Sequence, residues 1–303
     1  MLIPRIITAV VLLAVLAVLV SLPSPLYFAL FVSVASALTI FEWLRISLST
    51  PRKSIWAASI ALLSFALFIG MYALLIPDTD NNIMLALTKP TVFQTNPWAT
   101  VVFSSFIMLQ FFVAFAWIFI VPMVLYQAKT TVTSNSLFHS FFAIFASFTT
   151  WFSILIIYVF LGAWFLFSFL VIIWCADIFA YFGGKFFGGS KLAPAISPGK
   201  TRSGAVCGLV SVVVWMFVSV FIDGSFSELV SRYLGLIGSI CVGLLMAVVS
   251  IFGDLYESLL KRRAEVKDSS QLLPGHGGVW DRLDSVIAVT PIAMMFVFVL
   301  FIQ

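Results

Sequence analysis

The sequence predicts an all-α, polytopic helical membrane protein with about nine transmembrane helices. Of its 303 residues, 62% are hydrophobic and only 9% are charged, whereas a soluble domain has roughly 25% charged residues. The apolar runs are long and unbroken, which favours helices over the alternating strands of about 10 residues that build membrane barrels. No basic run interleaved with aromatic residues indicates a nucleic-acid partner.

Nine apolar stretches follow one another along the chain, and most reach the roughly 20 residues that a bilayer requires. Arg5 before the short first stretch is also typical of a signal peptide, although Ser21-Leu22-Pro23 is a poor cleavage site. The predicted spans are Ile6–Val20, Pro25–Leu44, Ile55–Ile76, Trp98–Tyr126, Leu137–Leu161, Ala163–Phe182, Ser203–Ile222, Tyr233–Tyr256 and Ser285–Ile302.

The distribution of basic residues predicts the orientation, because Lys and Arg concentrate in cytoplasmic segments. With nine spans and a cytoplasmic N-terminus, the C-terminus lies outside. Of the sixteen Lys and Arg residues, only Lys89 and Arg232 then fall on the outer side. Moving any one span in or out of the count would scramble this sorting.

Polar residues concentrate in two predicted cytoplasmic segments, 183–202 and 261–284. Residues 253–284 alone hold six of the twelve carboxylates and five of the sixteen Lys and Arg residues. We therefore expect an N-terminal transmembrane scaffold in residues 1–130 (spans 1–4). Residues 131–303 (spans 5–9) are predicted to form the catalytic transmembrane domain.

Carboxylates at the end of the eighth span predict a metal site. If the helix continues there, Asp254, Glu257 and Lys261 share one face with Ser258. An Asp costs roughly 2.5–3.5 kcal/mol at the centre of a membrane helix, and a divalent cation would offset that cost. Mg²⁺ binds carboxylate oxygens and keeps positions open for phosphate. A salt bridge to Lys261 is the alternative for Glu257, and Asp177, alone in the sixth span, is a further ligand candidate.

The run Leu273-Pro274-Gly275-His276-Gly277-Gly278 cannot form a regular helix. It predicts a tight turn whose exposed backbone N–H groups approach a phosphate. Asp281 beside this turn is a candidate metal ligand, whereas helix capping would explain Asp284. His276 lacks partners at zinc-site spacing, which leaves a phosphate or base contact or a structural role.

The segment Ser197-Pro198-Gly199-Lys200-Thr201 is not a P-loop, because Pro194 stands where that motif needs glycine and no strand is predicted before it. It predicts a turn that presents a lysine, a hydroxyl and backbone donors to an anion. Together with the carboxylates, these groups suit phosphoryl or nucleotidyl transfer to a lipid. A cation-coupled transporter is the alternative, but it would place carboxylates at the midplane in two related halves. A CDP-alcohol phosphotransferase would need an Asp-x-x-Asp-Gly-x-x-Ala-Arg motif, which is absent.

The pattern Ser258-x-x-Lys261-Arg262, then Lys267-Asp268, then His276-Gly277-Gly278-x-x-Asp281-Arg282-x-Asp284 resembles the signature of phosphatidate cytidylyltransferases, also called CDP-diacylglycerol synthases. Arg202 departs from the family, in which an aromatic residue often follows the Lys-Thr pair. We expect Asp254, Asp281, Lys261 and Lys267 to be catalytic, and Asp254, Asp281, Asp177 and Glu257 to bind metal. Substrate contacts are expected from Ser197, Gly199, Lys200, Thr201, Arg202, Ser258, Arg262, His276, Gly277, Gly278 and Arg282.

The resemblance implies the conversion of CTP and phosphatidic acid into CDP-diacylglycerol and pyrophosphate, as a step of phospholipid biosynthesis. It further implies Mg²⁺, a second, monovalent cation such as K⁺, and a homodimer. The protein is expected in the inner (cytoplasmic) membrane of a bacterium, with its site facing the cytoplasm.

Overall fold

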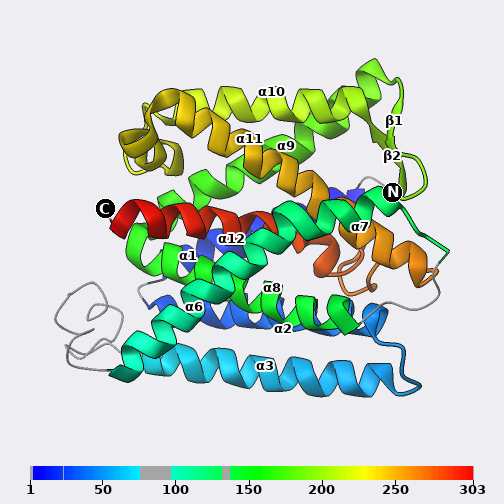
Figure 1. Cartoon of the computed structure of the whole chain (residues 1–303), viewed down its shortest axis with the longest axis horizontal. Coiled ribbons are helices and arrows are strands. Elements are labelled where there is room, and N and C mark those ends of the chain that lie inside the picture. Colours follow the sequence, from blue (N-terminus) through cyan, green and yellow to red (C-terminus); the bar gives the residue numbers. More distant parts are fainter. Residues whose placement is uncertain (1–2, 23, 76–96, 132–136, 303) are drawn as a thin grey trace.

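The computed structural model describes residues 3–22, 24–75, 97–131 and 137–302, and most of them are helical (Figure 1). The labels η1 and η2 denote short π-helical turns inside longer helical stretches. The elements are α1 (Ile3–Ser21), α2 (Pro25–Ser47), α3 (Lys53–Leu75), α6 (Pro97–Phe115), η1 (Ala116–Ile120), α7 (Val121–Gln127), α8 (Leu137–Ile156), η2 (Ile157–Leu161), α9 (Gly162–Phe187), β1 (Lys191–Ala193), β2 (Ser197–Thr201), α10 (Arg202–Ser219), α11 (Phe226–Arg263) and α12 (Trp280–Ile302).

Each of the nine predicted spans coincides with a helical stretch, which confirms the polytopic helical class. Within the described residues, seven stretches are long and apolar enough to cross a membrane. One of the seven, Leu137–Phe187, contains two predicted spans, and α1 is not among them. The exact number of crossings, the orientation and the division at residue 130 therefore stay predictions.

A small antiparallel hairpin, β1–β2, is an addition that the all-α prediction lacked. Lys191 pairs with Thr201 and Ala193 with Ser197. Thr201 ends the hairpin and starts α10, because its Oγ1 accepts a hydrogen bond from the backbone N–H of Gly204 at 3.1 Å. The segment Ser197–Thr201 is thus held rigidly between a strand pair and a helix start.

Among the helix ends that differ from the predicted spans, two carry site residues. α11 runs on to Arg263 instead of ending near Tyr256, since the Glu257–Lys261 ion pair one turn apart supports the added helix. α12 begins at Trp280 rather than Ser285, and Asp281 in its first turn suits the positive end of the helix dipole. Both helices therefore bring charged turns directly to the site.

The connections that carry most cations gather at one end of the molecule. In Figure 1 the β1–β2 hairpin, the α2–α3 connection and the C-terminal end of α11 lie at the right, together with the N-terminus, whereas the C-terminus lies at the left. The predicted sorting of Lys and Arg between the two sides of a membrane stays a prediction. Lys89 lies outside the described residues.

Aromatic packing ties the first half of the chain to the start of α12. Trp43 of α2 and Trp280 are both fully buried, and their rings stack at 4.5 Å between centroids with 8° between planes. Tyr256 of α11 meets the Trp43 ring edge-on at 5.7 Å. Large stacked rings contribute strongly to a core, so α2 is fixed against the two helices that carry the acidic residues.

Candidate active site

A cavity of about 680 Å³ opens between α9, the hairpin, α10, α11 and the start of α12. Both signs of charge line its walls. The acidic residues are Asp177, Asp254, Asp281 and Asp284, and the basic ones are Lys185, Lys191, Lys200 and Arg282. Such a set can hold an anion and a cation side by side.

Close helix packing brings two of these carboxylates together where α11 crosses α12. A Cβ at Gly253 would lie 2.6 Å from the backbone oxygen of Asp284, so only glycine permits this approach. Asp254 follows Gly253 directly, and its charge interacts with those of Asp284 and Asp177. Asp284 lies in the second turn of α12, and the expected helix capping does not explain it, because α12 begins at Trp280.

The hairpin places a lysine opposite this acidic wall. Nζ of Lys200 lies 2.5 Å from Oδ2 of Asp254, with both side chains about one-third exposed or less. A half-buried pair that solvent still reaches is worth less than a fully buried one. Lys200 can therefore exchange Asp254 for another anion at small cost.

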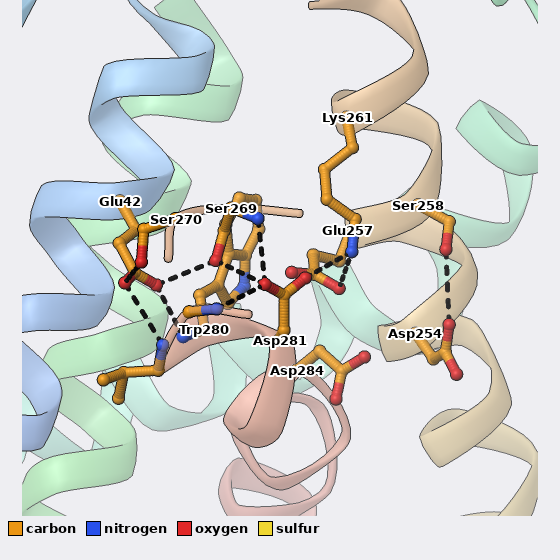
Figure 2. A network of polar contacts seen from close by, with 12 residues as sticks. Glu42, Asp254, Glu257, Ser258, Lys261, Ser269, Ser270, Trp280, Asp281 and Asp284 are labelled. Carbon is orange, nitrogen blue, oxygen red and sulfur yellow. Dashed lines mark hydrogen bonds and ion pairs between the residues drawn. The ribbon is translucent and has the colours of Figure 1, made fainter. Parts of the chain in front are cut away.

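A second ionic cluster lies beside the cavity around Lys261 (Figure 2). Its Nζ donates to Oε2 of Glu257 at 2.9 Å and to Oδ1 of Asp281 at 2.5 Å. Of the two interpretations of Glu257, the structure shows the salt bridge. Glu257 and Lys261 are buried and do not line the cavity. The charge of Lys261 is thus shared by two carboxylates of the protein, and its expected catalytic role stays a prediction.

The glycine turn is also different from the prediction. The N–H groups of His276 and Gly277 donate to the Leu273 oxygen, at 2.9 and 3.1 Å. That of Gly278 donates to Oδ2 of Asp281 at 2.7 Å. Those of residues 279 and 280 donate to a carboxylate of α2. Five consecutive N–H groups are thus bonded within the protein, and the turn does not present them to a phosphate.

That carboxylate is Glu42, which was not among the predicted site residues. It is 0% exposed, and in Figure 2 the segments before and after the glycine turn converge on it. A signal for it existed, because Glu42 is a lone acid in an apolar span, the same criterion that selected Asp177. Arg45, one turn later, donates to the Ser269 oxygen at 2.8 Å.

The structure divides the predicted site residues into two groups. Lining the cavity are Asp177, Ser197, Gly199, Lys200, Thr201, Asp254, Asp281 and Arg282. Lys185 and Lys191, which were not among the expected substrate contacts, line it as well. The others lie beside the cavity or away from it: Arg202, Glu257, Ser258, Lys261, Arg262, Lys267, His276, Gly277 and Gly278.

Several residues of the second group have structural partners. Ser258 donates to Oδ1 of Asp254 at 3.3 Å, and Arg262 donates to the Ile196 oxygen at 3.4 Å. Gly277 and Gly278 leave room for neighbours, because a Cβ would lie 2.6 Å from Oδ2 of Asp281 and 2.1 Å from Oγ of Ser269, respectively. The contacts of these residues are thus made within the protein.

The donor set fits a hard divalent cation. Asp177, Asp254 and Asp284 offer carboxylate oxygens to one cavity, and Mg²⁺ prefers such oxygens. Among the described residues, no three His, Cys, Asp or Glu side chains are close enough to hold a metal ion by themselves. One or two carboxylates, completed by water and substrate phosphates, are the usual protein share of a Mg²⁺ site.

The fold and the cavity define a helical membrane protein with a cavity lined by charges of both signs. Residues 3–300 match the profile of the cytidylyltransferase family, and the chain belongs to this family.

Curated relatives share part of the chain. A phosphatidate cytidylyltransferase of Haemophilus influenzae is 44% identical over 137 residues, which are 45% of this chain and 46% of that protein. The enzyme of the same name from Pseudomonas aeruginosa is 45% identical over 41% of this chain and 43% of its own length. The one from Rickettsia felis is 41% identical over 43% and 56%. The matched part thus spans about half the length of these relatives.

Proposed function

We propose that this protein transfers the cytidylyl group of CTP to phosphatidic acid, which yields CDP-diacylglycerol and pyrophosphate. Family membership and the names of the relatives support this reaction. The observation that carries it is the position of Arg282, which lines both the charged cavity and an apolar cavity of about 190 Å³ between α1, α2, α8, α9 and α12. A lipid phosphate and the start of an acyl chain can meet at this arginine.

The nucleotide is expected on the hairpin side of the charged cavity. Lys185, Lys191 and Lys200 line that wall, and three ammonium groups can neutralise a triphosphate. Lys200 would leave Asp254 for a phosphate oxygen, which frees this carboxylate.

The lipid phosphate is expected on the opposite wall, held by Arg282. A phosphate monoester has a second pKa of about 6, so its oxygen is already anionic near neutral pH and needs no general base. This oxygen forms the bond to the α-phosphorus of CTP in line, while the bond to the departing pyrophosphate breaks. Positioning and charge neutralisation supply most of the catalysis in such transfers.

Asp254, with Asp177 and Asp284 beside it, would hold Mg²⁺. When bound, the ion neutralises phosphate charge and orients the reacting groups. Asp281, also predicted as a ligand, accepts hydrogen bonds on both oxygens, so we assign it to holding Lys261 and the turn. A monovalent cation, a homodimer and a cytoplasmic-facing site in the bacterial inner membrane belong to the same proposal.

The direct test supplies purified protein with phosphatidic acid, labelled CTP and Mg²⁺. Labelled CDP-diacylglycerol should form, and it should disappear with EDTA or in an Asp254→Ala variant. Absence of product from the unmodified protein under all metal conditions would contradict the proposal. Family membership does not favour the transporter alternative, and proteoliposomes should show no ion flux.

A further inference from the structure

We propose that Glu42 of α2 is a positioning residue for this transfer: it fixes the segment that carries Asp281 and Arg282, and thereby the wall that meets the lipid phosphate. The inference rests on the proposed function. It adds a residue from residues 1–130, which were predicted to be a transmembrane scaffold.

Both oxygens of Glu42 accept two hydrogen bonds (Figure 2). Oε1 accepts from Oγ of Ser270 at 2.5 Å and from the N–H of Val279 at 3.1 Å. Oε2 accepts from Oγ of Ser269 at 2.9 Å and from the N–H of Trp280 at 2.8 Å. Ser269 and Ser270 precede the glycine turn and the other two residues follow it, so one carboxylate closes the loop at its base.

The same network reaches the cavity wall. Oγ of Ser269 lies 2.9 Å from Glu42 and 2.8 Å from Oδ2 of Asp281, so this one hydroxyl connects the two carboxylates. Gly278 is packed so closely that a Cβ would lie 2.4 Å from Oε2 of Glu42. Arg282 follows Asp281 on the first turns of α12, so any shift of this helix start moves both side chains.

The bonding pattern requires a carboxylate. Burial of a charge is costly unless it is hydrogen-bonded. Glu42 accepts from two backbone N–H groups and the Ser270 hydroxyl, and it shares the single proton of the Ser269 hydroxyl with Asp281. A glutamine has one oxygen and one NH₂ group. Whichever way the amide points, its NH₂ faces the N–H of Val279 or Trp280, and a backbone N–H cannot turn away. Glu42→Gln therefore keeps the side-chain shape and loses one backbone anchor.

The experiment compares steady-state kinetics of Glu42→Gln and the unmodified protein. The KM for phosphatidate should rise at least fivefold, because Arg282 lies on the wall that Glu42 holds. The KM for CTP should stay within twofold, because Lys185, Lys191 and Lys200 lie on α9 and the hairpin, which Glu42 does not touch. A smaller active fraction alone would change neither KM.

Two further variants complete the design. Ser270→Ala removes one hydroxyl that donates to Glu42 without altering the buried charge. It should raise the KM for phosphatidate about twofold to threefold and leave the KM for CTP unchanged. If Glu42→Gln does not fold, this variant tests the role of Glu42 in its place. Glu228→Gln is the matched control, since Glu228 pairs with Arg232 at the N-terminal end of α11, and both KM values should stay as in the unmodified protein.

Hydrogen exchange gives a readout that is independent of activity. In Glu42→Gln, the amides of Val279 and Trp280 should exchange at least tenfold faster, while the peptide across β2 and α10 should not change. Unchanged KM values and unchanged exchange would overturn the role of Glu42, and so would an equal rise in both KM values. An unmodified protein without transferase activity would instead overturn the proposed function.

Discussion

At the scale of single residues, Lys261 neutralises two buried carboxylates and is itself only 10% exposed. Lys261→Met would leave Glu257 and Asp281 without their cation, and removing one partner of a buried ion pair costs about 3–5 kcal/mol. We expect a loss of about 3 kcal/mol in the free energy of unfolding, measured by equilibrium unfolding in mixed micelles. Lys267→Met, at an exposed position, should change it by less than about 0.5 kcal/mol. A loss below about 1 kcal/mol for the first variant would contradict the buried cluster.

Two glycines predict opposite outcomes for the same substitution. In Gly278→Ala the new methyl group would lie 2.1 Å from Oγ of Ser269 and 2.4 Å from Glu42, so the turn must shift, and we expect a lower melting temperature and at least a tenfold loss of transferase activity. Gly70→Ala in α3 meets nothing within 4 Å and replaces a helical glycine, which should add roughly 0.5–1 kcal/mol. In thermal unfolding in detergent, the melting temperature should fall for Gly278→Ala and rise for Gly70→Ala. Equal shifts of the two melting temperatures would contradict this interpretation.

At the scale of elements, the glycines of α10 hold α9 in place. Gly204 and Gly208 lie one turn apart and let α10 approach α9 closely: a Cβ at these positions would lie 2.5 Å from the Ala180 oxygen and 2.6 Å from the Ala176 oxygen. Asp177 follows Ala176 directly. The contact therefore sets how far Asp177 stands from the opposite wall of the cavity.

A larger side chain at this contact should therefore affect catalysis. Gly208→Leu must push α9 and α10 apart and move Asp177, so we expect transferase activity to fall at least tenfold. Val210→Leu lies on the same helix, is 57% exposed and introduces the same residue, so its activity should stay within twofold. Assays at equal protein and lipid concentration test both variants, and equal activities would show that the spacing of the two helices is immaterial.

How far the sequence predicts the elements depends on what fixes them. Hydropathy locates each span, because burial in lipid is decided by long runs of apolar side chains. It does not locate the ends of α11 and α12, where ion pairs and the helix dipole extend the helix through polar residues. The motif residues could be identified from the sequence as a set, but the structure places some of them at the cavity and others away from it. Whether Lys261 faces a phosphate or Glu257 depends on which helices cross, and residue spacing along one chain does not contain that information. The role of Glu42 could not be predicted for the same reason, since its hydrogen-bond partners are more than two hundred residues away in the sequence.

At the scale of the whole molecule, the two ends differ in charge, and this predicts how the protein sits in the membrane. Arg52 and Lys53 lie at the start of α3 and residues 261–267 at the end of α11, at the end of the molecule that holds the charged cavity, whereas Asp223 lies in the α10–α11 connection. The positive-inside rule places the first group in the cytoplasm. Only that orientation gives the cavity access to CTP in the cytoplasm, the nucleotide of the proposed reaction.

Single cysteines test this orientation. After Cys175, Cys207 and Cys241 are replaced by alanine, Asp223→Cys or Lys267→Cys is introduced at an exposed position. In right-side-out vesicles, an impermeant maleimide should label Asp223→Cys and leave Lys267→Cys unlabelled until the membrane is permeabilised. In inverted vesicles the pattern should reverse, and CTP added outside should then be converted without permeabilisation. The opposite labelling pattern would place the cavity on the outer face, where the proposed nucleotide is not supplied, and the orientation and the proposed reaction would then contradict each other.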